Sequence, residues 1–216
     1  MHSQGQAPLP SNPRGMPATD DQIREKYLER AIRELNAFAR DLQAWSHGPR
    51  GQLMPVLGSG HPQADIFLIK HSARPSEVEE GVAFYGRTGN ALVKSLRRLS
   101  IDPLAVYGTL CVKCPVPDPE LADPACVARI AEELAIVQPK LVVVMGEDAL
   151  AVVNELDLPL GRCLEPRPGE IQRFTPTIEA LYAPNIDEAL DEEAAKRKFW
   201  RAFRVLGQWW ADLPPY

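Results

Sequence analysis

The sequence predicts a three-layer α/β/α sandwich, with helices on both faces of a central, mostly parallel sheet of four strands. Short apolar runs alternate with longer segments of helical periodicity, and this order is typical of a parallel sheet with helices on both sides. The clearest run, residues 141–145, is uncharged and rich in valine, as expected of a strand buried on both faces. The 216 residues, 45% of them hydrophobic, can bury the core of one domain.

The first part of the chain divides into a tail and a helix. Residues 1–19 contain four prolines among small polar residues, a composition that predicts a disordered tail. From residue 20, Ile23, Tyr27, Ala31 and Leu35 recur at helical spacing with charged residues between them. We therefore expect an amphipathic helix over 20–48 that packs on the α/β/α domain, which we place at 49–212.

Within this domain, strands and helices are expected to alternate. The first strand is predicted at 65–70 and the second helix at 89–99, and a strand at 106–112 follows. A helix from about residue 123, the strand at 141–145 and a short helix through 153 come next. A further strand near residue 174 or at 180–182 and a final helix at 190–210 complete the prediction.

Charge and hydropathy limit the compartment and the partners. No apolar run approaches the roughly 20 residues of a membrane span, and the first residues contain no apolar signal-peptide core. We therefore expect a cytoplasmic protein with no membrane partner. The net charge is −5, so binding to nucleic acid would require a local basic face. The oligomeric state is left open.

Two neighbouring segments carry a specific pattern. The first is Val56-Leu57-Gly58-Ser59-Gly60-His61-Pro62-Gln63-Ala64-Asp65-Ile66-Phe67-Leu68-Ile69, and the second is Phe84-Tyr85-Gly86-Arg87-Thr88-Gly89. At this spacing the two segments resemble the uracil-DNA glycosylase superfamily, and most of all its bacterial family 4. The resemblance implies the same α/β/α fold and, as an activity, base excision by hydrolysis of an N-glycosidic bond.

The family's catalytic acid lies in the motif V-G-E-[AG]-P-G, where it positions or activates the attacking water. This chain has Ile69-Lys70-His71-Ser72-Ala73-Arg74 at that place, so His71 replaces the acid. A neutral imidazole can act as a base near pH 7, which makes His71 a candidate catalytic residue. The alternative is a surface histidine on an altered loop.

The positions that hold the base are only partly retained. Phe84 stands where the family stacks an aromatic ring on the flipped base, although it could equally be a core aromatic. Leu110 replaces the asparagine of T-N-x-V-K-C-R-P-P and cannot hydrogen-bond uracil. The histidine of Y-H-P-S is absent from Tyr182-Ala183-Pro184-Asn185. The candidate site therefore comprises Phe84, Ser72, Leu110 and Tyr182 around the base, with His71 and Asn185 as candidate catalytic residues.

An acidic loop follows this last motif, where the family inserts residues into DNA. Five of the seven residues from Asp187 to Glu193 are acidic, which disfavours contact with phosphates. The alternative interpretation is a solvated turn that opens a helix, where acidic residues are favourable. Basic residues on the neighbouring helices are expected to form ordinary solvated faces: Lys94, Arg97, Arg98, Lys196, Arg197, Lys198, Arg201 and Arg204.

Four cysteines indicate free thiols or a metal site rather than a disulfide framework. Cys114 and Cys126 match two of the family's iron–sulfur ligands, but the N-terminal cysteine pair is missing. Because two thiolates do not hold such a cluster, we expect no cofactor and no metal. A substitute site formed with Cys111 and Cys163 is an alternative, which strand alternation opposes.

Three hypotheses for the function follow. The first is a divergent glycosylase that uses His71, Phe84 and Asn185 without the usual uracil-reading residues. The second is a catalytically silent, glycosylase-like module that binds DNA or a repair protein. The third is an enzyme acting on a free nucleobase or nucleoside, for which the 187–193 loop would face solvent.

Overall fold

The computed structural model describes residues 20–44, 54–115 and 124–214, with the side chains of α4 from Arg129 onward. The predicted tail at 1–19 lies outside these residues. The helices are α1 (Asp20–Ala44), α2 (Pro75–Glu80), α3 (Gly86–Arg98), η2 (Pro103–Ala105), α4 (Pro124–Val137), α5 (Glu147–Asn154), α6 (Ile186–Asp191) and α7 (Glu193–Ala211). The strands are β1 (Ser59–Gly60), β2 (Ile66–Lys70), β3 (Val106–Leu110), β4 (Leu141–Met145), β5 (Ile171–Arg173) and β6 (Glu179–Ala183).

The sheet confirms the predicted α/β class but contains six strands rather than four, in the order β1-β3-β2-β4-β6-β5. The four central strands are parallel, and β1 and β5 are antiparallel edge strands. The sequence predicts β2, β3 and β4 because they are rich in apolar and β-branched residues, and the structure buries all three on both faces. The edge strands have two and three residues and lack such a run, which is why the prediction missed them.

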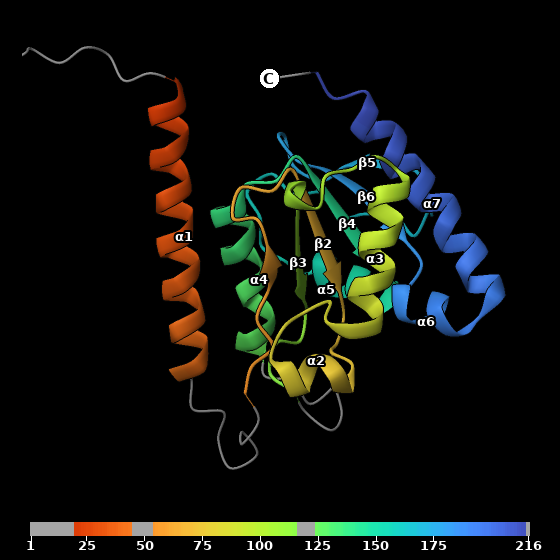
Figure 1. The fold of residues 1–216 in the computed structure, drawn as a ribbon, viewed down its shortest axis with the longest axis horizontal. Coiled ribbons are helices and arrows are strands. Elements are labelled where there is room, and N and C mark those ends of the chain that lie inside the picture. The colour runs from red at the N-terminus through yellow and green to blue at the C-terminus, as the bar shows by residue number, and fades with distance from the viewer. Residues whose placement is uncertain (1–19, 45–53, 116–123, 215–216) are drawn as a thin grey trace, which may run out of the picture.

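Helices cover both faces of the sheet, and they enclose two hydrophobic cores. Side chains alternate between the faces along each strand. Leu68, Leu110 and Ala183 thus belong to the core that includes residues of α3, α6 and α7. Ile69, Cys111 and Tyr182 belong to the core that includes residues of α4 and α5. Figure 1 shows α3 and α7 together on one side of the sheet and α4 on the other.

The predicted final helix at 190–210 is wrong in its boundaries, because the structure forms two helices there. Asn185 accepts a hydrogen bond from the Asp187 N–H at 2.9 Å and so caps the start of α6. Glu192 then adopts an extended conformation, with φ −123° and ψ 126°, and separates α6 from α7. Both helices are amphipathic, and the periodicity alone does not show the single extended residue between them.

Helix α1 packs along α4 at the outside of the molecule (Figure 1). Phe38 and Leu42 of α1 are buried and share a small core with Cys114. Residues 45–48 of the predicted helix lie outside the described residues. Within the described ranges, none of the helices has the length and apolar character needed to cross a bilayer.

Candidate functional site

The last residues of the four parallel strands form one row across the sheet. Leu110 of β3 is in register with Lys70 of β2, Lys70 with Met145 of β4, and Met145 with Ala183 of β6. Strand alternation points this row toward the α3 and α6 side of the sheet. In open α/β sheets, ligands bind at this carboxyl edge. Lys70 is the only one of the four with a charged side chain.

Lys70 is almost completely buried, with 1% of its side chain exposed, and it has two carboxylate partners. Its Nζ lies 2.6 Å from Oε2 of Glu77 and 2.8 Å from Oδ2 of Asp187. Glu77 belongs to α2 and is fully buried, and Asp187 belongs to α6. A buried ammonium group is stable only when it is paired in this way. The cluster of Lys70, Glu77 and Asp187 therefore links the strand end to α2 and α6.

Phe84 lies beside this cluster and is 8% exposed. Its ring centroid is 5.6 Å from Lys70 Nζ. A Cβ atom added to Gly108 of β3 would lie 2.6 Å from the ring, so the ring packs directly on the bare strand backbone. The Phe84 N–H donates to Oε1 of Glu77 at 2.5 Å. The structure thus places Phe84 as a core aromatic that holds its loop on the sheet.

The backbone of Phe84 is left-handed, with φ +57°, which is uncommon outside glycine. Gly89 makes this conformation possible, because a Cβ atom there would lie 1.9 Å from the Phe84 carbonyl oxygen. The hydrogen bond to Glu77 holds the same residue from the other side. Glu77 therefore positions both Lys70 and the aromatic loop.

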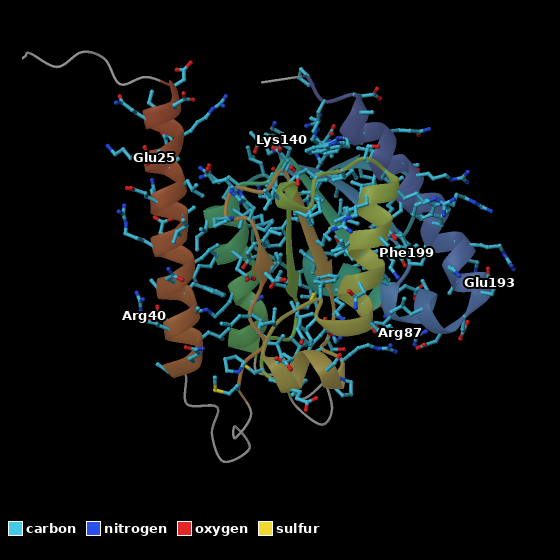
Figure 2. All side chains as sticks on the ribbon, viewed as in Figure 1. Glu25, Arg40, Arg87, Lys140, Glu193 and Phe199 are labelled. Atoms are coloured by element: carbon cyan, nitrogen blue, oxygen red, sulfur yellow. The ribbon has the colours of Figure 1, made fainter. Side chains whose placement is uncertain are left out.

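The acidic loop folds over the Lys70 cluster. The Thr88 hydroxyl donates to the second carboxylate oxygen of Asp187 at 2.7 Å. Arg74 and Arg87 both contact the Asp191 carboxylate, at 2.8 Å and 2.5 Å, and their hydrogen bonds lower the pKa of Asp191. Figure 2 shows Arg87 at the end of α3 that faces α6. The prediction that these acids open a helix is correct, but the expected solvation is wrong for Asp187, which is paired.

Three of the predicted site residues come together elsewhere. His71, Tyr182 and Asn185 line a cavity of about 530 Å³ at the carboxyl edge, next to α5. The same cavity is lined by four acids and one lysine: Glu147, Asp148, Glu188, Glu192 and Lys198. Burial raises the pKa of Tyr182, and the nearby negative charges add to this effect. The cavity is therefore acidic.

The structure places the predicted residues in two groups, one in the hydrophobic core on the α3 side of the sheet and one at the cavity. Phe84 and Leu110 belong to the core on the α3 side, and Leu110 has no exposed surface. His71 and Tyr182 lie at the acidic cavity. Ser72 is partly exposed in the loop between β2 and α2. His71 follows the last residue of β2 and lies in the loop that leads to α2.

The cysteines do not share one environment. Cys111 is buried, and burial raises the pKa of its thiol to about 12. Cys163 is exposed. Cys114 is disulfide-bonded, so the expectation of a free thiol or a metal ligand is wrong at this position. Sequence spacing does not reveal which sulfur atoms come within bonding distance. The side chain of Cys126 lies outside the described part of α4.

The prediction missed Lys70, Glu77 and Asp187 as members of one cluster. The available signal was a lysine at the end of an apolar strand, where V-G-E-[AG]-P-G has glycine. A charge that ends a strand buried on both faces needs a partner. The partner itself could not be found in the sequence, because Asp187 is 117 residues away.

The comparisons with known proteins agree with this geometry. Curated protein sequences give no match to the chain. The family model of the uracil DNA glycosylase superfamily matches residues 57–204, which is more than half of the chain. This match includes the central sheet, the Phe84 loop and α6. The chain therefore belongs to the uracil DNA glycosylase superfamily.

Proposed function

We propose that this protein is a glycosylase-fold binding module that recognises a protein partner and does not excise uracil. The observation that carries the proposal is the buried cluster of Lys70, Glu77 and Asp187. It lies at the carboxyl ends of the parallel strands, near the Phe84 ring and in the row that also contains Leu110 and Ala183. In the family pattern, glycine stands at the position of Lys70, asparagine at that of Leu110 and histidine at that of Ala183.

A flipped base needs a free aromatic face and polar groups that read its edge. Phe84 is largely covered, and Lys70 Nζ lies near its ring. To admit a base, Lys70 would have to leave Glu77 and Asp187, which would separate buried charges at high cost. Leu110 offers no hydrogen bond in return. These features support a pocket that the chain fills with its own side chains.

The charge of the carboxyl edge favours a protein partner over DNA. Glu147, Asp148, Glu188 and Glu192 line the cavity at this edge, and a DNA backbone would meet their negative charge. Family membership makes a repair protein the natural class of partner.

The test is abasic-site formation on uracil-containing single-stranded and duplex DNA, with enzyme in excess over DNA. The wild type and a Phe84→Ala, His71→Ala double variant are purified in parallel, so that traces of host glycosylase give product in both. We expect no product above this background. Product from the wild type alone would overturn the proposal and support a glycosylase rebuilt around His71.

A free nucleoside is the second candidate ligand, because the acidic cavity of about 530 Å³ lies within the range of small-molecule sites. It holds His71, Tyr182 and Asn185 together at the edge where ligands bind in this fold class. A bound nucleoside would raise the melting temperature by mass action. If nucleosides raise the melting temperature of the wild type but not that of a Tyr182→Ala variant, the nucleoside is favoured over the protein partner.

A further inference from the structure

A groove lies between α3, α6 and α7, and it shares no lining residue with the acidic cavity. Its volume is about 330 Å³. The floor is apolar and includes Ala91 of α3, Ala189 and Leu190 of α6, and Phe199 and Trp200 of α7. Figure 2 shows Phe199 between α3 and α7, and Glu193 at the outer end of α7.

Four cations surround this floor: Lys94 and Arg98 from α3, and Lys196 and Arg197 from α7. The one acid in the lining is Glu193, whose carboxylate is 3.5 Å from Lys196 Nζ. Among the residues that the structure describes, Lys94, Arg98 and Arg197 have no carboxylate partner. By contrast, Arg74 and Arg87 near the strand ends are paired with Asp191.

The groove is therefore a local exception in a chain of net charge −5. Unpaired cations around an apolar floor complement a ligand that carries acids on both sides of apolar side chains. An amphipathic helix docks in such a groove through apolar residues at i, i+3, i+4 and i+7. We propose that the groove binds an acidic amphipathic segment of a partner protein. This inference rests on the proposed role as a binding module and names the chemistry of its partner.

The same features disfavour a nucleic acid at this site. Base stacking needs an open aromatic face, but the Arg98 guanidinium already lies 4.7 Å from the Trp200 ring centroid. An apolar floor offers nothing to a phosphate backbone, whereas it can bury leucine or phenylalanine side chains. Arg98 and Trp200 both line the groove, where both can contact a peptide.

The experiment measures binding of a fluorescein-labelled, 16-residue synthetic peptide to the full chain by fluorescence anisotropy. The peptide has leucine at the four helical anchor positions and glutamate at most others. One control peptide has the same composition in scrambled order, and a second has serine in place of leucine. A labelled oligothymidylate of similar length tests nucleic acid. We expect the first peptide to bind at least tenfold more tightly than each of the other three ligands.

A charge-reversed variant, Lys94→Glu with Arg197→Glu, should weaken binding of the first peptide by tenfold or more. The matched control, Lys26→Glu with Arg40→Glu, makes the same change in net charge on exposed positions of α1 and should leave binding unchanged. Added salt should weaken binding of the first peptide to the wild type, and it should weaken binding to the Lys94→Glu, Arg197→Glu variant less. Circular dichroism of both variants separates loss of binding from loss of the fold.

Three results would overturn the inference: no preference for the amphipathic peptide, equal binding by the groove variant, or tighter binding of oligothymidylate that the groove variant loses. The last result would assign the groove to nucleic acid. The proposed function fails separately, through uracil excision by the wild type. If the protein excises uracil and also binds the peptide, the proposed function is wrong but the groove inference stands.

Discussion

Lys70 and Asp187 form an ion pair of 2.8 Å across 117 residues of sequence. Lys70 ends the central strand β2, and Asp187 lies in the first turn of α6. Together with Glu77, they fix α2 and α6 to the carboxyl end of the sheet. A lysine in place of the family's glycine thus has a partner in the loop that follows β6, and the acids of that loop have a structural role.

Replacing Lys70 tests the energetic weight of this cluster. Lys70→Met leaves Glu77 and Asp187 without their cation, and we expect it to lower the free energy of unfolding by about 3–5 kcal/mol. Urea denaturation measures the change. A triple variant that adds Glu77→Gln and Asp187→Asn should recover part of the loss, because no buried charge remains unpaired. Lys94→Met, at an exposed position of α3, is the matched control and should have little effect. An equal loss in the control would contradict the account.

The Asp191 contacts predict a dependence on pH. Hydrogen bonds from Arg74 and Arg87 lower the pKa of Asp191 in the folded state. A group with a lowered folded pKa stabilises the fold above its unfolded pKa, which is about 3.9 for aspartate, and this contribution disappears as pH falls through the folded pKa. The stability difference between the wild type and Asp191→Asn should therefore be constant near neutral pH and shrink below about pH 4. A difference that grows on acidification would show that Asp191 is not held by these arginines.

Gly108 should be sensitive to a single methyl group. A Cβ atom there would lie 2.6 Å from the buried Phe84 ring, so Gly108→Ala should destabilise the protein by about 1–3 kcal/mol. Thermal denaturation of a double-mutant cycle with Phe84→Ala checks the cause. In the Phe84→Ala background the glycine substitution should cost much less. If its cost is unchanged, the ring does not pack on Gly108 in solution.

The two free cysteines of the described residues should differ in reactivity. Cys163 is exposed, whereas Cys111 is buried and has a thiol pKa raised to about 12. Because the thiolate is the nucleophile, iodoacetamide at pH 8 should label Cys163 in the native protein and reach Cys111 only after unfolding. Peptide mass spectrometry identifies the labelled residue. Rapid labelling of Cys111 in the native protein would contradict its burial in the core between the sheet and α4.

The sequence predicts the scaffold better than the site. Strands β2, β3 and β4 could be predicted because they are short runs rich in apolar and β-branched residues, and α1 because its apolar residues recur at helical spacing. The edge strands could not, because two or three residues carry no periodicity. At the site, motif positions indicated His71, Phe84 and Leu110 as candidate residues. They did not reveal that Leu110 is buried in the core, whereas His71 lines the cavity next to α5.

The Lys70 cluster was missed for a related reason. The role of Asp187 depends on a contact over a long sequence separation, and a loop with five acids in seven residues is usually solvated. Only the three-dimensional arrangement shows that Lys70, Arg74 and Arg87 meet two of those acids. Glu77 was likewise not predicted, although it binds both Lys70 and the Phe84 N–H.

The most direct test of the central claim is an NMR experiment on the lysine ammonium groups. Lys70 and Lys113 are both at most 1% exposed and ion-paired, so their ammonium protons should exchange slowly with water. The account predicts a slowly exchanging ammonium signal that disappears in Lys70→Arg and shifts in Asp187→Asn, while the signal of Lys113 stays in place. If no such signal belongs to Lys70, its side chain is not held at the base position, and the proposal of a filled pocket is wrong.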